Sequence, residues 1–403
     1  MNSQHDDGSS VARWAKGLLA GLLALVAVAC GGGVGGQGTG TFGYSNGAIT
    51  GFGSIVVNGV HFDESTARIH DADGNTLSRD TLRLGMTVEI QSGAIDNTAL
   101  TATAQDVNVI SDLLGPVSAV DLTASTMTVL GQTVRITAST LFDSSLAGGL
   151  SAISLGQKVE VYAIFDPVNT VYAARLVLPR SNPDHYTLRG VVSGWNSAQR
   201  QFQMGPATLT YAADAVPAGL ANGATLRLRL STQADGSGRW VVTTAQPATY
   251  LPADGTEAEI EAVVSSYTSL SSFVVAGVTV DASAAQLNAN GLTLAAGVRV
   301  EVEGRMQGTV LKATKLELKG SEDSAGGDDS GSGQEFELSG LISGLDTTAQ
   351  TFVIRTQTVS YAQASFEPPG TAANLANGVK VEVKGMRSSD GTLVTASEVK
   401  FDN

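Results

Sequence analysis

One short phrase occurs five times along the chain, and this repetition limits the fold more than any other feature. Its clearest forms are LANGVKVEVKG at 375–385 and LAAGVRVEVEG at 294–304. Weaker forms are LRLGMTVEIQSG at 82–93, ISLGQKVEVYA at 153–163 and LANGATLRLRLS at 220–231. Self-similarity at a regular spacing indicates an array of like structural units. We therefore expect five units of one fold.

The glycine of each phrase measures the period. Successive glycines, at 85, 156, 223, 297 and 378, are separated by 71, 67, 74 and 81 residues. The last interval contains SEDSAGGDDSGSGQ at 321–334, an acidic Gly/Ser-rich stretch that cannot bury a core. A period near 70 is long enough for each unit to own a small core. The expected segments are repeat 1 at 47–109, repeat 2 at 110–183, repeat 3 at 184–254, repeat 4 at 255–320, a linker at 321–334 and repeat 5 at 335–403.

Each repeat is expected to be all-β. Apolar residues alternate with small or polar ones, as in a half-buried strand, and turns recur about every ten residues. In the repeated phrase the glycine makes a tight turn, after which Val-Glu-Val directs valines inward and glutamate outward. About five strands in such a short unit favour a partly open five-stranded barrel of the OB type. A small β-sandwich is the alternative, although an immunoglobulin-like sandwich needs about seven strands.

The N-terminus is predicted to be a cleaved signal peptide, residues 1–29. Arg13 and Lys16 precede the apolar run GLLAGLLALVAVA at 17–29. A helix of that length spans roughly 20 Å, less than a bilayer core of about 30 Å. Such a run is typical of a signal-peptide apolar region. A buried helix is the alternative, but the glycine-rich GGGVGGQGTG that follows could not continue it.

Cys30, the sole cysteine, follows this run directly, and AVAC resembles a bacterial lipobox. That resemblance implies acylation of Cys30, so the membrane would be a partner through its acyl chains. Two or more chains make a stable anchor. Gly31 after the cysteine resembles an outer-membrane sorting signal, facing the periplasm or the cell surface. Residues 30–46 are expected to be a glycine-rich flexible tether.

The pattern L-x-x-G-x-x-V-x-V-x-G, with a later L-x-A-x-x-[VIL], resembles the bacterial domain-of-unknown-function family 5666. Repeats 4 and 5 match best, through Gly297, Val300, Val302, Gly304, Leu311 and Ala313, then Gly378, Val381, Val383, Gly385 and Leu393. Repeat 3 departs from the pattern, with Leu226, Leu228 and Leu230 where Val-x-Val-x-Gly is usual. The resemblance implies tandem domains in a lipoprotein of the cell envelope and brings no established activity.

Catalytic and metal-binding groups are scarce. His61 and His70 lie near several acids in HFDESTARIHDADGN, yet the spacing matches no metal signature, and DADGN is more typical of a hairpin turn. No serine lies in a G-x-S-x-G elbow. Glu301 and Glu303 share one strand face, where alternate charges are usually solvated. We therefore expect no enzyme activity, no cofactor and no metal site.

Repeat 3 is the one chemically unusual segment. It carries arginines and tryptophans in a chain whose net charge is −14, which itself disfavours nucleic acid as a partner. OB barrels bind ligands across one face, and Arg and Trp suit stacking. The candidate binding residues are Trp195, Arg200, Arg227, Arg229, Arg239 and Trp240. Buried tryptophans and solvated arginines are the alternative.

Two functions follow as expectations. The first is a membrane-anchored, non-enzymatic envelope lipoprotein that acts as a structural or protein-interaction array, with envelope proteins as partners. The alternative is a glycan- or peptide-binding protein that uses repeat 3. A continuous Arg/Trp groove would favour binding, whereas buried tryptophans would favour the structural array.

Overall fold

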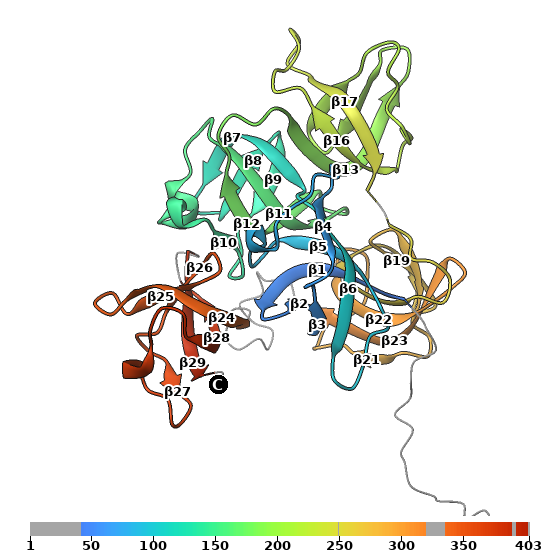
Figure 1. Cartoon of the computed structure of the whole chain (residues 1–403). Helices are drawn as coiled ribbons and strands as arrows, with labels where there is room; N and C mark the ends of the chain where they lie inside the picture. Colours follow the sequence, from blue (N-terminus) through green and yellow to red (C-terminus); the bar gives the residue numbers. More distant parts are fainter. Residues whose placement is uncertain (1–41, 249, 320–334, 389–391, 402–403) are drawn as a thin grey trace, which may run out of the picture. The chain divides into compact units, whose positions relative to one another are not determined.

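The computed structural model describes residues 42–248, 250–319, 335–388 and 392–401. The signal segment, Cys30 and the linker at 321–334 lie outside the described residues. The described chain is all-β, with short 3₁₀ turns at Arg79–Thr81, Ser144–Leu146, Gly149–Ala152 and Ala372–Asn374. Figure 1 shows the strands gathered in compact groups that follow the colour scale along the sequence. Among the described residues, no helix has the length and apolar character needed to cross a membrane.

Repeat 1 forms a closed five-stranded barrel. Its strands are β1 (Gly43–Phe52), β2 (Ile55–Val57), β3 (Val60–Asp63), β5 (Thr87–Ser92) and β6 (Thr101–Val109). β1 pairs with β2, and β2 with β3, in antiparallel hairpins. β3 then pairs parallel with β6, β6 antiparallel with β5, and β5 antiparallel with β1. This closure is that of an OB-type barrel, and the short β4 (Arg68–Asp71) lies parallel to β6.

The other four repeats have the same strand connectivity. The prediction of five-stranded barrels is therefore confirmed, and the repeats are not small β-sandwiches. Repeat 2 consists of β7 (Leu113–Asp121), β8 (Thr126–Val129), β9 (Gln132–Arg135), β10 (Leu141–Phe142), β11 (Lys158–Asp166) and β12 (Val171–Pro179). Repeat 3 consists of β13 (Tyr186–Asn196), β14 (Gln201–Met204), β15 (Ala207–Thr210), β16 (Thr225–Leu230) and β17 (Trp240–Pro247).

The same order continues beyond repeat 3. Repeat 4 consists of β18 (Glu257–Ser269), β19 (Ser272–Val275), β20 (Val278–Asp281), β21 (Gln286–Asn288), β22 (Arg299–Gln307) and β23 (Val310–Lys319). Repeat 5 consists of β24 (Glu335–Asp346), β25 (Thr351–Ile354), β26 (Gln357–Ser360), β27 (Ser365–Phe366), β28 (Lys380–Arg387) and β29 (Val394–Phe401). In both, a parallel pairing closes the barrel, β20 with β23 and β26 with β29.

The repeated glycine has one structural task in every copy. Its φ lies between 79° and 89° in all five repeats, a backbone region that favours glycine. Its N–H donates to a carbonyl of the first strand, at 2.8 Å from Gly378 to Ile342 and 2.9 Å from Gly297 to Val264. The residues that follow then pair with that first strand. The glycine therefore starts the pairing that closes the barrel.

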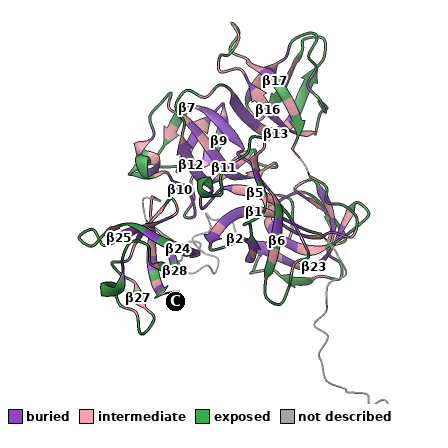
Figure 2. Ribbon diagram, viewed as in Figure 1, coloured by how far each residue is buried: buried purple, intermediate pink, exposed green. Residues whose placement is uncertain are grey.

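The two apolar positions after this glycine face the core. Val300 and Val302 in repeat 4, like Val381 and Val383 in repeat 5, are 0% exposed. Figure 2 shows that buried residues follow the strands while exposed residues gather in the turns between them. Packing therefore accounts for the recurrence of the phrase, as the alternation predicts.

The repeats are connected to one another more closely than their sequence boundaries suggest. Residues 43–46, expected to belong to the flexible tether, are instead part of β1 and pair both with β5 and with β18 of repeat 4. Leu113 and Leu114 pair with β13 of repeat 3. Buried apolar residues of the described chain form three continuous clusters, one of which contains residues of repeats 1, 2 and 5. Apolar contacts therefore continue across the boundaries between the barrels.

Candidate functional site

The acidic segment around His70 is a turn. The Asp71 carboxylate accepts from the backbone N–H groups of Asp73 and Asn75, both at 2.9 Å. Gly74 has a φ of 83° and completes the turn. His70 Nε2 lies 2.9 Å from the Asp106 carboxylate. These contacts hold the local backbone and the end of β4, so they fit the hairpin interpretation of DADGN rather than a shared ligand set.

Asp73, at the tip of this turn, forms an ion pair with repeat 3. Arg227 donates from Nη1 and Nη2 to the two Asp73 oxygens, at 2.6 Å and 3.3 Å. Both side chains are 8% exposed. Burial raises the pKa of Asp73, but the hydrogen bond and charge of Arg227 outweigh it, so the pKa is lowered from its ordinary value. Arg227 is therefore already bound within the chain.

Arg229 lies beside the same carboxylate. Its Nη2 is 2.8 Å from Nδ1 of His185, and His185 Nε2 is 3.3 Å from Asp73. Asp184 adds a second carboxylate, 3.6 Å from Arg229 Nη2. Two of the six candidate binding residues, Arg227 and Arg229, are thus brought together by an internal network of charges.

The other four candidate residues of repeat 3 contact residues of their own repeat or lie in an exposed turn. Trp240 is half-buried and packs edge-to-face on Tyr186, with ring centroids 5.5 Å apart. Trp195 is 36% exposed, and its indole N–H donates to the Tyr211 hydroxyl at 3.1 Å. Arg239 pairs with Asp235 inside its own hairpin, and Arg200 lies in the exposed turn before β14. Arg227 and Arg229 thus share one carboxylate, whereas Trp195, Arg239 and Trp240 each have a different partner within repeat 3.

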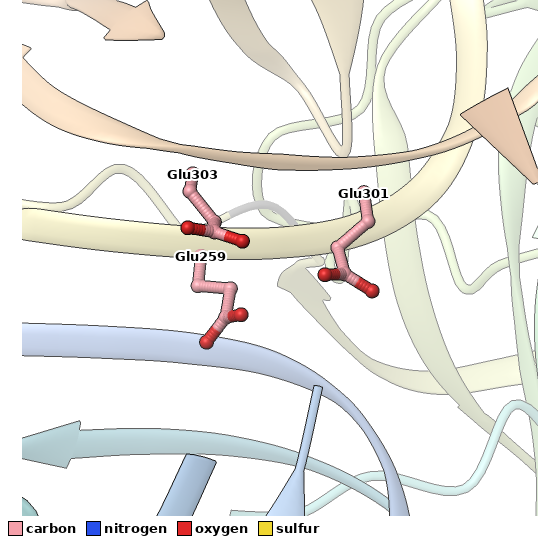
Figure 3. A group of neighbouring side chains, drawn as sticks. All are labelled: Glu259, Glu301 and Glu303. Atoms are coloured by element: carbon pink, nitrogen blue, oxygen red, sulfur yellow. The ribbon is translucent and has the colours of Figure 1, made fainter. Parts of the chain in front are cut away.

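Repeat 4 carries a different group of polar side chains, all carboxylates. Glu259 comes from β18, and Glu301 and Glu303 come from β22; the antiparallel pairing sets Glu259 opposite Glu303. One carboxylate oxygen of each lies within 4.8 Å of the others. Figure 3 shows the Glu259 and Glu303 carboxylates near each other, with that of Glu301 beside them.

Two of these three carboxylates are enclosed rather than solvated. Glu259 is 5% exposed and Glu301 is 9% exposed. The expectation that Glu301 and Glu303 are simply solvated is therefore wrong for Glu301. Oε2 of Glu259 is buried and has no hydrogen-bond partner among the described residues. Burial, together with the charges of Glu301 and Glu303, raises the pKa of Glu259 to about 9.

Two lysines of β23 border the carboxylates. Lys315 Nζ lies 2.5 Å from the Glu303 carboxylate, and Lys319 Nζ lies 3.1 Å from that of Glu301. Lys319 also contacts Glu317 at 3.1 Å. Burial raises the pKa of Glu301, and Lys319 partly offsets that rise. The carboxylate cluster, defined as Glu259, Glu301 and Glu303, is thus bordered by two lysines and contains one buried oxygen that has no hydrogen-bond partner in the described part of the chain.

Sequence reasoning missed the role of Glu259. The signal was the alternation EAEIE at 257–261 beside VEVEG at 300–304, which places acids on the same face of two strands. The alternation does not show which strand lies beside β18, because its register against β22 depends on the tertiary fold. The ion pair of Asp73 was missed for the same reason, since its partner Arg227 lies 154 residues away.

The geometry defines an array of five OB-type barrels whose outward strand positions carry the polar chemistry. A family model described as Domain of unknown function (DUF5666) matches residues 115–176, 260–317 and 339–400. Repeats 2, 4 and 5 are therefore tandem domains of that family. No curated protein matches the chain. Repeats 1 and 3, which the model does not match, nevertheless have the same strand connectivity.

Proposed function

We propose that the protein is a membrane-anchored, non-enzymatic lipoprotein of the bacterial cell envelope that serves as a structural or protein-interaction array. The anchor would be the acylated Cys30, held at the outer membrane and facing the periplasm or the cell surface. The observation that carries the proposal is the use of charged side chains between repeats. Arg227, the most enclosed of the candidate binding arginines, is bound by Asp73 of repeat 1.

A second buried pair supports the structural interpretation. Arg189 of β13 donates from Nη1 to Asp112 at 3.0 Å, and Asp112 is 0% exposed. Burial raises the pKa of Asp112, and the Arg189 guanidinium partly offsets the rise. Arg189 also donates to the carbonyl of Ala248 at 3.0 Å. Asp112 directly precedes β7, so this pair connects the start of repeat 2 with repeat 3.

The anchor has a direct test. Cells that express the wild type or Cys30→Ser are grown with a labelled fatty acid and then fractionated. The wild type should carry the label and sediment with the outer membrane, whereas Cys30→Ser should carry no label. Equal labelling of the two proteins would contradict the anchor.

The partner class is tested in the same cells by cross-linking. An interaction array should yield cross-linked envelope proteins, and Trp195→Ala combined with Arg200→Ala should leave them unchanged. A glycan- or peptide-binding protein would instead be retained on immobilised glycans or peptides and lose this retention in the double variant. The exposed indole of Trp195 is the observation that favours this second function.

A further inference from the structure

We propose that Glu259, Glu301 and Glu303 of repeat 4 form a binding site for one divalent cation of the size of Ca²⁺. Carboxylate oxygens are the ligands that hard divalent cations prefer. The three side chains come from two adjacent strands of one barrel, so the site lies on a rigid framework. This site is independent of the membrane anchor and of repeat 3.

The distances place the three carboxylates within reach of one cation. Ca²⁺ binds oxygen at about 2.3–2.6 Å, so two ligands on opposite sides of the ion are about 4.6–5.2 Å apart. The three carboxylate oxygens lie within 4.8 Å of one another, so they fit around one such ion, with water completing its coordination. Mg²⁺ demands near-ideal octahedral geometry and usually keeps several of its waters, whereas Ca²⁺ accepts the less regular arrangement that side chains from two strands offer.

A second observation points to a ligand. Glu259 is 5% exposed, and its buried Oε2 has no hydrogen-bond partner in the described chain. Buried polar atoms are nearly always paired, so an orphan oxygen in a native structure needs an explanation. The Glu259 side chain lies opposite Glu303 in the strand pairing, and Figure 3 shows its carboxylate near those of Glu303 and Glu301. A bound cation would supply the missing partner.

The local charge favours a cation. With Glu261 and Glu317 the cluster brings five negative charges when ionised, and four positive ones come from Lys315, Lys319, Arg175 and Arg299. The excess is one negative charge, which a bound cation offsets. The lysine side chains are 42% and 26% exposed, so each can turn toward solvent while its stem stays on the strand. The lysines therefore compete with the cation and weaken its binding.

The test is a calorimetric titration of CaCl₂ into the purified full-length protein after treatment with a chelator. We expect saturable binding of one Ca²⁺ per chain, and MgCl₂ should bind at least about tenfold more weakly. Glu259→Gln and Glu303→Gln should each weaken Ca²⁺ binding by about tenfold or more, equivalent to about 1.4 kcal/mol. Glu337→Gln is the matched control, because Glu337 has the strand position of Glu259 in repeat 5 but lies opposite Lys384.

Replacing a lysine should change the Ca²⁺ affinity in the opposite direction. Lys315→Gln removes a competing charge and should tighten Ca²⁺ binding by about tenfold. A thermal melt of each variant confirms that it is folded, and Ca²⁺ should raise the melting temperature only of proteins that bind it. The proposal is overturned by the absence of saturable binding up to about 10 mM Ca²⁺, above the range of about 0.1–1 mM typical of weak extracellular sites. Equal affinity in wild type and Glu259→Gln, or stronger binding of Mg²⁺, would overturn it as well.

Discussion

Repeats 3 and 4 carry opposite charges at two equivalent positions of their barrels. Counting four and six residues from the repeated glycine gives Arg227 and Arg229 in repeat 3, and Glu301 and Glu303 in repeat 4. The arginines have a partner from another repeat, the Asp73 carboxylate. The glutamates have lysines of their own repeat and one another. The difference shows that the barrel fixes where these side chains lie but not what they bind.

The same comparison separates two kinds of position in the phrase. The glycine and the inward aliphatic residues recur because the turn and the core require them. The outward positions vary among Glu, Gln, Tyr, Arg and Lys, since no contact within the barrel dictates them. Function in this family of barrels is therefore expected to reside at the outward positions, where neighbours and ligands supply the constraint.

The largest effect on stability is expected from breaking the ion pair between Asp73 and Arg227 of repeat 3. Asp73→Ala leaves the Arg227 guanidinium, 8% exposed, without its carboxylate and should destabilise the protein by about 3–5 kcal/mol. The measurement is the free energy of unfolding in urea. The double variant Asp73→Ala with Arg227→Met removes both charges and should recover most of the loss. A cost below about 1 kcal/mol for the single variant would show that the ion pair is not structural.

The carboxylate cluster of repeat 4 should make stability depend on pH. The folded protein keeps a proton on Glu259 up to about pH 9, whereas the unfolded chain releases it near 4.5. Folding therefore takes up a proton, and stability falls as the pH rises through this window. Glu259→Gln should remove that fall. Its free energy of unfolding relative to the wild type should therefore be about 2–3 kcal/mol higher at pH 7 than at pH 4.

This comparison uses urea unfolding at several pH values in the presence of a chelator. Glu337→Gln serves as the control and should keep the wild-type pH profile. If wild type and Glu259→Gln have parallel profiles between pH 4 and 9, Glu259 is ionised in the folded protein.

An intermediate effect on stability is expected at the glycine of the repeated phrase, tested at Gly378 of repeat 5. Gly378 has a φ of 86°, and a Cβ there would meet no atom within 4 Å, so only the backbone conformation opposes a side chain. Gly378→Val should cost about 1–3 kcal/mol. Urea unfolding of the full-length protein measures it, and Gly378→Ala should cost less. A neutral Gly378→Val would mean that the turn readily adopts another conformation.

The smallest effect is expected at an outward position. Glu382 has the place of Glu301 in repeat 5, lies 3.7 Å from Lys400, and is 31% exposed at its side chain. Glu382→Lys should change the free energy of unfolding by no more than about 0.5 kcal/mol, because exposed pairs contribute little. A loss of stability as large as that of Gly378→Val would contradict the assignment of Glu382 to an outward position.

The local features of the fold could be predicted from the sequence. The repeated glycine, the inward valines and the five-stranded barrel follow from turn chemistry and from a period of two, which act over a few residues. The pairing of residues 43–46 with β18 could not, because glycine-rich sequence is typical of a tether and the partner lies more than 200 residues away. Long-range pairing of this kind leaves no local pattern.

The candidate site was harder to predict for the same reason. The positions of Arg227 and Arg229 on an outward strand face were predictable, but the carboxylate that binds them comes from a turn in repeat 1. The glutamates of repeat 4 were visible as same-face pairs, yet their burial depends on which strand lies beside them. Composition cannot distinguish a solvated charge from an enclosed one.

The pairing of β1 has a mechanical consequence. Residues 43–46 are hydrogen-bonded to β5 on one side and to β18 on the other. Tension applied to the chain ahead of Gly43 would act along β1 and load both ladders in shear. The bonds of both ladders would then carry the force together, instead of opening one after another. A pull at this end of the array would therefore be shared between repeats 1 and 4.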